Sequence, residues 1–493
     1  MPLDLPEKKA NIKINRRSWK LNPDPSHVIC RPHIPGGHPE RIKAIIGRVL
    51  DLSDLEADSV CAQVMLDFSE RHRNLPGILE NHYKLVERYL PEGEEICRTK
   101  RVLIGAYFTM EYAVSAAALF NPSIVPHPNQ TKLQANELRF VMSVRAVGEG
   151  HISSLAFRSG VIRANGKIDF DKVTDYVETP RGTLNTAFKK SEFLCSLECF
   201  QIASSKASPV LDKLADEFDL GRLEEVLRQL TGDERQTVGD DNIRIMEWLA
   251  YSNYEIDFEK AQTISERVIF PVSPSERAGM EDARFVRFVN DDGSARYYGT
   301  YTAYDGKNIM PQFIETEDFS HFKISSVNGK SVRNKGIALF PRKVNGRYYM
   351  LGRLDGENNY LLSSDDLYCW QDSKIIQGPA EPWEFIQLGN CGSPMETSKG
   401  WLVLTHGVGP MREYSISAIL LDLEEPEKVI ARLRTPLLRP HEEERAGYVP
   451  NVVYSCGALI HNDELYLPYA MSDISCGMVS MNVHELIDAM DPF

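Results

Sequence analysis

The sequence predicts a mainly β protein: a five-bladed β-propeller with an N-terminal α-helical domain and a helical insertion. Three observations support this fold. The first hundred or so residues place apolar side chains at helical spacing, later segments alternate or run apolar as strands do, and a unit of several strands recurs. A chain of 493 residues is also too long for one ordinary domain. We assign residues 1–114 to the helical domain and 115–493 to the propeller, with the insertion at about 181–275.

The N-terminal segment begins its helical pattern at HPERIKAIIGRVLDLS. In this stretch Ile42, Ile45, Ile46 and Val49 follow a spacing of three and four, which makes one apolar face of a helix. LEADSVCAQVMLDFSERH and LPGILENHYKLVERYLP continue the pattern, and KRVLIGAYFTMEYAVSAAALF is apolar enough to pack on its neighbours. We therefore expect a small helical domain.

From Asn121 onward, turn dipeptides separate short strand-like segments. They are Asn-Gly at 165–166, 328–329 and 345–346, and Asp-Gly at 292–293 and 305–306. Between about 181 and 275 the helical pattern returns, most clearly in SPVLDKLADEFDLGRLEEVLRQL. We interpret that segment as an insertion or cap.

A loose internal repeat runs through the rest of the chain. Each unit has a polar start, an apolar strand, a turn, and an aromatic-rich strand with a polar end, as in EDARFVRF, DDGS and ARYYGTYTAYD. After a first unit at FNPSIV, four more begin near 281, 334, 393 and 449, a period of about 55 residues. Five units of several strands each are what a β-propeller requires, and a sandwich explains the period less well.

Radial repetition brings equivalent residues of every blade to the central axis. The starts of the units supply Asn121, Ser123, Asp282, Lys335, Glu396 and Asn451. The ends of the second strands supply Arg145, Tyr304, Arg353, His406 and Asp473. Such a mixture of acids, cations and amides is typical of a site for a polyhydroxylated ligand.

The composition narrows the class of partner. A formal net charge of −14 argues against nucleic acid, and no apolar stretch approaches the roughly 18 residues of a membrane span. The N-terminal MPLDLPEKKANIKINRRSWK has charge without an apolar core, so we expect no signal peptide and a cytoplasmic location. The nine cysteines are scattered, without zinc spacing, so we predict mostly buried thiols and no metal site.

Six motifs resemble the five-bladed propellers of glycoside hydrolase family 130, which are β-mannoside phosphorylases and related β-mannosidases. They are FNPS, EDARF, NKGIALFP, GWLVLTHGV, ILLDLEEP and YVPNVVYSCG. The resemblance covers roughly 115–180 and 270–493, with the motifs in the family's order. The N-terminal helices and the insertion lie outside it and receive no functional interpretation.

The resemblance implies that Asp282 is the general acid, in a motif where Ala283 replaces the usual proline. It also implies that the proton reaches the glycosidic oxygen through a hydroxyl of the mannose ring. A carboxyl group in that role needs a raised pKa. Glu281 could help by repulsion, although neighbouring strand residues point to opposite faces, whereas Arg284 would share the side of Asp282 and steady its carboxylate or a substrate oxygen.

Further positions match the family's sugar-binding residues: Asn121, Ser123, Arg145 and Asp473. Simpler structural roles stay open for three residues. Asp473 could be a turn acid, Lys335 a solvated strand-end lysine, and Glu396 an ion-pair partner of Lys335 or Arg353.

The nucleophile divides the enzymatic hypotheses. An attacking phosphate needs basic side chains, which Lys335, Arg353 and Arg412 could supply. Glu396 stands where the resemblance suggests lysine, and a carboxylate there would repel phosphate but could activate water for inverting hydrolysis. Glu444 is a second candidate base.

We therefore expect cleavage of a short β-linked manno-oligosaccharide by a single inverting displacement, with water preferred as the nucleophile. The alternative is phosphorolysis to mannose 1-phosphate, with inorganic phosphate as the co-substrate and no other cofactor. A non-catalytic sugar-binding propeller is the hypothesis of a different class. Linkage and the sugar that is released stay open, as does a homo-oligomer assembled through the extra helices.

Overall fold

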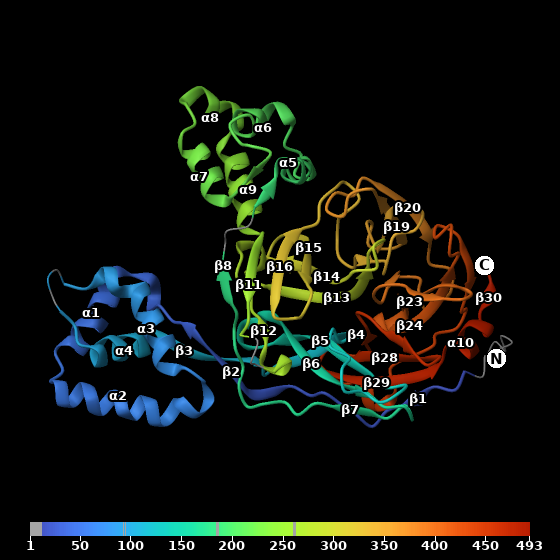
Figure 1. Cartoon of the computed structure of the whole chain (residues 1–493), viewed down its shortest axis with the longest axis horizontal. Helices are drawn as coiled ribbons and strands as arrows, with labels where there is room; N and C mark the ends of the chain where they lie inside the picture. Colours follow the sequence, from blue (N-terminus) through green and yellow to red (C-terminus); the bar gives the residue numbers. More distant parts are fainter. Residues whose placement is uncertain (1–11, 92, 94, 184–186, 260–262) are drawn as a thin grey trace.

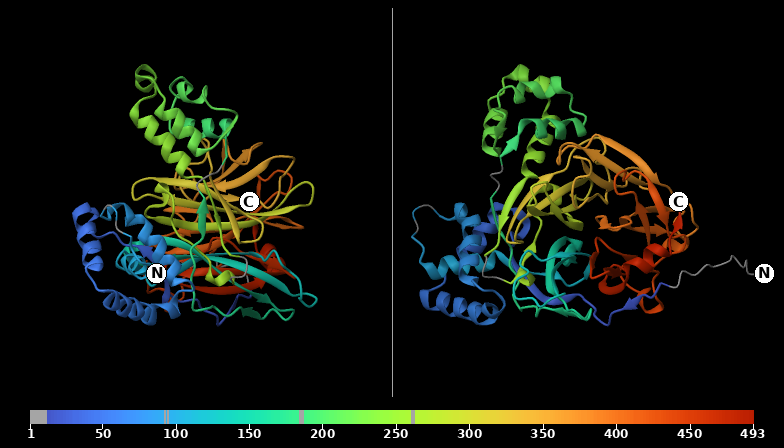
Figure 2. Two further views of the ribbon diagram at one scale, coloured as in Figure 1. Left: turned by 60° about the vertical axis from the view of Figure 1, so that its left-hand side comes forward. Right: turned by 45° about the vertical axis from the view of Figure 1, so that its right-hand side comes forward.

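The computed structural model describes residues 12–91, 93, 95–183, 187–259 and 263–493. It contains a body of β-strands and two groups of helices (Figure 1). Both helical groups lie at the periphery of the strands in the two further views of Figure 2. None of the helices in these residue ranges combines the length and the apolar character needed to cross a membrane.

The first helical group lies between two strands that pair with each other. Its elements are β2 (Asp24–Pro32), α1 (Pro39–Leu50), α2 (Asp54–Phe68), α3 (Leu75–Val86), α4 (Arg98–Tyr107) and β3 (Thr109–Ser115). The apolar face predicted for the first helix is confirmed, because Ile42, Ile46 and Val49 are buried and Ile45 packs against them. Ser53 caps α2 in a capping box with Glu56.

The second helical group is an excursion from a pair of strands. It comprises α5 (Lys190–Cys199), α6 (Ser204–Leu211), α7 (Leu220–Arg228), α8 (Gly232–Val238) and α9 (Asp240–Tyr251), with the short pair β9 (Phe188–Lys189) and β10 (Glu217–Phe218). The strands before and after it, β8 (Arg181–Thr183) and β11 (Tyr254–Asp257), pair antiparallel. The helices therefore fall inside the predicted insertion.

The β body consists of five successive groups of mostly antiparallel strands. The first two groups are β4 (Ala118–Pro126), β5 (Leu138–Val147), β6 (Ser153–Ile162) and β7 (Ile168–Phe170), then β13 (Gly279–Val289), β14 (Ala295–Tyr304), β15 (Ile309–Thr316) and β16 (His321–Ser326). The third is β17 (Ala338–Leu339), β18 (Tyr348–Gly352), β19 (Asn359–Ser364) and β20 (Asp372–Gln377). The fourth is β21 (Gln387–Asn390), β22 (Met395–Thr397), β23 (Gly400–Val408), β24 (Tyr414–Leu421) and β25 (Val429–Arg432). The fifth is β26 (Val453–Tyr454), β27 (Leu459–His461), β28 (Glu464–Met471) and β29 (Ser475–Asn482).

Short elements join these groups. A parallel bridge between β6 and β13 puts the first two groups in one sheet, and β12 (Val268–Ile269) pairs with β6. β1 (Asn15–Arg16) pairs with β29, so part of the segment assigned to the helical domain belongs to the β body. β30 (Asp491–Pro492), which follows α10 (Val483–Asp488), pairs with β25. The pairings establish a mainly β protein, whereas closure of the five groups around one axis stays a prediction.

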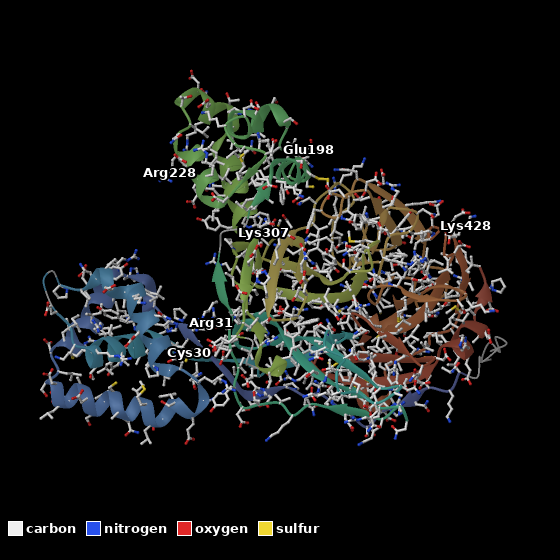
Figure 3. The ribbon with its side chains drawn as sticks, in the orientation of Figure 1. Cys30, Arg31, Glu198, Arg228, Lys307 and Lys428 are labelled. Carbon is white, nitrogen blue, oxygen red and sulfur yellow. A yellow bond between two sulfur atoms is a disulfide. The ribbon has the colours of Figure 1, made fainter. Side chains whose placement is uncertain are left out.

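A disulfide connects the insertion to the β body, where we expected mostly free thiols. It joins Cys195 of α5 to Cys369, which lies between β19 and β20, across 174 residues. Cys199, one helical turn after Cys195, accepts a hydrogen bond from the backbone N–H of Gly329 at 2.7 Å. Glu198 of the same helix is labelled in Figure 3. The sequence did not indicate this pairing because so long a separation has no recognisable spacing.

Breaking the disulfide should loosen the insertion. A cross-link over a loop of this length is worth about 5 kcal/mol in the chain-entropy model. We expect Cys369→Ser to lower the unfolding temperature and to speed proteolysis within the insertion, whereas Cys97→Ser, at an exposed free cysteine, should do neither. Titration of the denatured protein should find seven thiols without reductant and nine with it. Nine thiols in both samples would contradict the bond.

Candidate functional site

A β-bulge shapes the start of β13. Glu281 pairs with Thr302 and Arg284 with Thr300, so two residues on β13 face one on β14. Asp282 lies within the bulge with a φ of 57°, in the left-handed region. Strict alternation is therefore broken, and our expectation that Glu281 and Asp282 point to opposite faces is wrong: both carboxylates reach Arg145.

The two carboxylates share a partly buried group of polar side chains. Asn121 Nδ2 donates to Asp282 Oδ1 at 2.7 Å, and Arg145 Nη1 lies 3.4 Å from the same oxygen. Arg145 Nη2 donates to Glu281 Oε1 at 2.9 Å, while Lys335 Nζ donates to Glu281 Oε2. Lys335 is thus an ion-pair partner of Glu281 rather than a solvated lysine.

The pKa of Asp282 is lowered, not raised as a general acid would require. Burial alone would raise it. The positive charges of Arg145 and Arg284, and the hydrogen bond from Asn121, outweigh burial. Asp282 is consequently ionised in the unliganded protein at neutral pH.

A second carboxyl group in the site behaves in the opposite way. Asp473 lies in the turn between β28 and β29 with a φ of 52°. Burial and the negative charge of Asp282 raise its pKa to about 7, although Arg145 and Arg412 act against the shift. Of the two acids, Asp473 is the one that holds a proton near neutral pH.

Two of the predicted ligand-binding residues hold the backbone. Arg284 is fully buried, and its Nη1 donates to the backbone oxygen of Asp282 at 3.1 Å, while Nη2 donates to Tyr454 Oη at 2.5 Å. Ser123 is also buried, and its Oγ accepts from the N–H of Phe285 at 3.0 Å. Arg284 therefore acts on Asp282 through the backbone and through its charge, and Ser123 fixes the strand after the bulge.

A cationic part of the site surrounds His406. The Nδ1 of His406 lies 3.2 Å from the carbonyl oxygen of Asn390, so Nδ1 carries the hydrogen and Nε2 is free to accept from Arg353 Nη1 at 3.4 Å. Burial, then Arg353 and Arg284, place the pKa of His406 well below its usual range, so the ring is neutral. Within the described ranges, Arg353 contacts His406 but has no carboxylate at ion-pair distance, and its buried Nε has no partner. This guanidinium is available to an anion.

Three other predicted residues remain: Tyr304 ends β14, while Arg412 and Asn451 lie in turns. The ring of Tyr304 lies 5.8 Å from Lys335 Nζ. The guanidinium of Arg412 lies 5.6 Å from the ring centre of Tyr414 and is close enough to Asp473 to affect its pKa. Asn451, by contrast, has its side-chain oxygen engaged by Arg445 Nη1 at 2.9 Å.

The two predicted catalytic bases have structural roles. Both carboxylate oxygens of Glu396 accept from Arg342, at 2.9 and 2.7 Å, on side chains that are 44% and 38% exposed. Glu444 accepts from Arg16 at 2.5 Å and from Tyr469 at 2.6 Å, and its other oxygen caps its own turn. Neither carboxylate contacts the group around Asp282, so we withdraw both as bases.

The sequence missed several members of the site. Asn390 and Tyr454 were not predicted, and Glu281 was considered only for its charge. One sequence signal could have indicated the left-handed backbone of the site: an Asn or Asp recurs at the start of several strand groups, and these residues tolerate positive φ. Asn121, Asp282 and Asn451 all have positive φ in the structure. Among the described residues, no group of three or more His, Cys, Asp or Glu could hold a metal ion.

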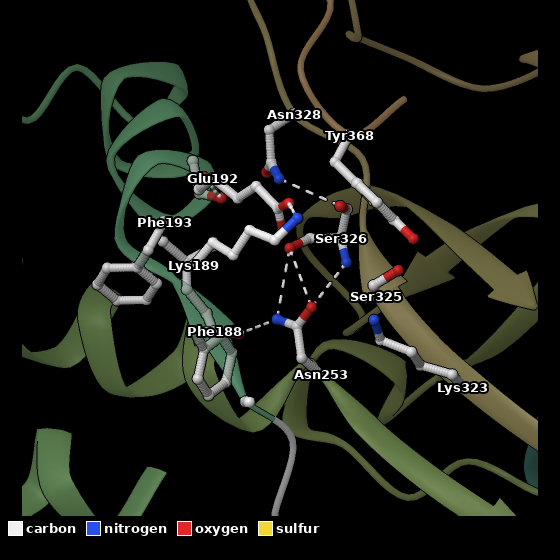
Figure 4. Close-up of a pocket in the computed structure, with 13 residues that line it drawn as sticks. Phe188, Lys189, Glu192, Phe193, Asn253, Lys323, Ser325, Ser326, Asn328 and Tyr368 are labelled. Atoms are coloured by element: carbon white, nitrogen blue, oxygen red, sulfur yellow. Dashed lines mark hydrogen bonds and ion pairs between the residues drawn. The ribbon is translucent and has the colours of Figure 1, made fainter. Parts of the chain in front are cut away.

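Two cavities differ in their relation to this site. A small one behind the acid is lined by Arg145, Ser154, Leu155, Met280, Asp282, Ala283 and Tyr301. A second pocket lies between the insertion and β16, where Lys189, Phe193 and Tyr368 line it (Figure 4). No residue predicted for the functional site lines the second pocket.

Comparisons with known proteins identify the class of protein. Residues 248–492 match the family model of glycoside hydrolase family 130, described as beta-1,4-mannooligosaccharide phosphorylase. The chain is 35% identical over 222 residues to 1,2-beta-oligomannan phosphorylase of Thermoanaerobacter sp., which covers 43% of this chain and 71% of that protein. It is 29% identical to beta-1,2-mannobiose phosphorylase of Listeria innocua, over 46% and 65% of the two chains. The crystal structure of a Listeria innocua beta-1,2-mannobiose phosphorylase complex superimposes with a TM-score of 0.47 at 22% identity, covering 77% and 93%.

These matches place the chain among the carbohydrate-active enzymes. It belongs to glycoside hydrolase family 130, which confirms the resemblance carried by the sequence motifs. The hypothesis of a non-catalytic propeller is accordingly not retained.

The raised pKa of Asp473 should be measurable as a pH dependence of stability. Its folded pKa of about 7 exceeds the ordinary value of 3.8, so the folded state binds more protons between these values and stability falls as pH rises from about 4 to 7. Asp473→Asn removes this loss, and we expect a gain of about 4 kcal/mol at pH 8 that fades towards pH 4. Denaturant unfolding across that range measures it.

Asp355→Asn is the matched control with the opposite sign. Burial raises the pKa of Asp355, but hydrogen bonds from the N–H groups of Asn358 and Glu357 outweigh it and lower the pKa to about 2. The stability contributed by Asp355 is present above its unfolded pKa and lost as pH falls through about 2, so this variant should lose stability at pH 8. Equal behaviour of the two variants would refute the assignment.

Proposed function

We propose that the chain is a β-mannoside phosphorylase, which cleaves a β-linked manno-oligosaccharide with inorganic phosphate and releases mannose 1-phosphate. The observation that carries the proposal is the Arg353 guanidinium, which has no carboxylate partner among the described residues and lies against a neutral His406. An arginine in that state suits a phosphate oxyanion. The names of the related phosphorylases support the same activity.

The proposed fold of the catalytic body is the five-bladed propeller. Five successive strand groups and positive φ values at the starts of several of them support a common axis. On that arrangement the turn of Asp473 and the bulge of Asp282 face one pocket. Their electrostatic coupling supports this placement.

The reaction is a single displacement. A phosphate oxygen attacks the anomeric carbon from the side opposite the leaving group, the bond from that carbon to the glycosidic oxygen breaks, and the configuration inverts. The leaving oxygen receives a proton that originates on Asp282 and passes through a ring hydroxyl of the mannose, as the family resemblance implies. Asn121 and Arg145 hold the Asp282 carboxyl in place.

The charges of the site couple the arrival of phosphate to this proton transfer. Asp282 is ionised in the free protein because Arg145, Arg284 and Lys335 outweigh the effect of burial. A phosphate dianion held by Arg353 offsets the positive charge of the neighbouring Arg284, which acts on His406 as well, so the pKa of Asp282 rises. Asp473, with a pKa of about 7, carries a proton in about half of the molecules at neutral pH.

The sequence favoured water as the nucleophile, and the evidence favours phosphate instead. Glu396 was the reason for preferring hydrolysis, and its carboxylate is occupied by Arg342 on an exposed surface. Because Glu396 does not face the site, it does not repel an anion there. The related curated proteins are also named as phosphorylases.

Two further parts of the proposal concern the cell. A cytoplasmic location remains our proposal. The Cys195–Cys369 disulfide argues against it, because such bonds are typical of oxidising compartments. Whether the bond forms in the cell therefore tests the location. Assembly into a homo-oligomer through the extra helices likewise remains a proposal.

Product analysis tests the function directly. The purified protein is incubated with β-mannobioses of defined linkage, with and without inorganic phosphate, and products are separated by chromatography. We expect mannose 1-phosphate only in the tubes with phosphate, because phosphate is the attacking nucleophile and becomes part of the product. Free mannose released at the same rate in both tubes would restore hydrolysis.

Two substitutions, at Asp282 and at Glu396, distinguish the proposed general acid from the residue that we withdrew as a base. Asp282→Asn should reduce kcat by about 100- to 10,000-fold, the usual contribution of a general acid. Glu396→Gln should leave kcat within about twofold, since its loss breaks only a surface ion pair. A large loss of kcat in the Glu396→Gln variant, with unchanged unfolding temperature, would return that residue to the mechanism.

A further inference from the structure

Tyr454 lies where the acid and the cationic parts of the site meet. It ends β26 and is only partly exposed. Its hydroxyl oxygen accepts from Arg284 Nη2 at 2.5 Å, and Arg284 in turn donates to the backbone of Asp282. Its ring packs edge-on against His406 at 4.9 Å between ring centres, and His406 contacts Arg353. One residue therefore touches both halves of the site.

The hydrogen of this phenol is unused. A tyrosine hydroxyl accepts through its oxygen and has one hydrogen to donate. Arg284 has hydrogens only to donate, so its bond to Tyr454 uses the oxygen. In the part of the chain that the structure describes, no acceptor receives the phenolic hydrogen. Burial, aided by the negative charge of Asp282, holds the pKa of Tyr454 well above its usual value despite Arg284, so the hydrogen stays in place.

The surroundings indicate what kind of acceptor the hydroxyl would meet. Arg284 and Arg353 are positively charged and His406 is neutral, so an anion is favoured over a cation or a further donor. A phosphate oxygen has lone pairs to accept from a phenol and from a guanidinium together. The oxygens of a sugar hydroxyl would gain less from this field.

We propose that Tyr454 is a further ligand of the attacking phosphate, donating its phenolic hydrogen to one phosphate oxygen while Arg284 fixes the position of its own oxygen. The inference rests on the proposed phosphorolysis and adds to it a residue outside the predicted set. Arg284 Nη1 donates to the backbone oxygen of Asp282, while Nη2 holds the Tyr454 hydroxyl. The position of the phenol therefore depends on the bulge that carries Asp282. Tyr454 thereby aligns the nucleophile with the acid.

The test is Tyr454→Phe, which removes the hydroxyl and keeps the ring against His406. A hydrogen bond to a charged group is worth about 10- to 100-fold in binding. We expect KM for phosphate to rise by that factor, with kcat at saturating phosphate and KM for the mannoside each within about threefold. Tyr466→Phe, on β28 and outside the site, is the matched control and should change none of these.

Measuring phosphate binding at equilibrium tests the role of Tyr454 without relying on catalytic turnover. Calorimetry with inorganic phosphate alone should show the same weakening for Tyr454→Phe and none for Tyr466→Phe. If Tyr454→Phe fails to fold, site-specific 3-fluorotyrosine replaces it. Its more acidic hydroxyl is a stronger donor and should tighten phosphate binding.

The possible failures are distinguishable. A wild-type protein that forms product without phosphate overturns the proposed function itself. A wild-type protein that needs phosphate, with phosphate affinity unchanged within twofold in Tyr454→Phe, overturns only the role of Tyr454. A rise in KM for the mannoside equal to that for phosphate would assign the residue to general support of the site, and would also overturn it.

Discussion

The bulge at Asp282 is the constraint on which the rest of the site depends. Extra length in β13 turns two adjacent carboxylates to one arginine, which regular strand alternation forbids. The left-handed backbone of Asp282 is held by Arg284 from behind, and the strand after it by Ser123. Two buried residues, Arg284 and Ser123, thus hold the backbone that positions the Asp282 carboxylate.

The ion pairs of the site form one network, because single residues pair with more than one partner. Arg145 serves both Glu281 and Asp282, and Lys335 completes the pairing of Glu281. Arg353 is left with a neutral imidazole as its neighbour. In the described part of the chain, Glu281 and Asp282 are thus ion-paired on one side of the site, while Arg353 on the other side has no carboxylate partner.

Sequence reasoning predicted the elements and several residues of the site, but not all of their contacts. Helical spacing predicted the buried face of α1, and the recurring units predicted the strand groups, because both patterns are local. Asp282, Asn121 and Arg145 were expected together and do meet. Glu396 was misassigned because a motif gives the position of a residue along a strand and not its side-chain contacts. The Cys195–Cys369 bond and the Tyr454 hydroxyl depend on packing between distant segments, which one sequence does not encode visibly.

The pairing of β8 with β11 determines how the second helical group is attached to the β body. The last strand before the second helical group and the first strand after it lie side by side in one sheet. The whole helical excursion is therefore, topologically, an enlarged hairpin turn. A hairpin turn can lengthen or shorten without changing the register of its strands, so the helices leave the pairing of β8 with β11, and of β11 with β16, undisturbed. The disulfide is a second attachment of the same helices to the β body, remote from that turn.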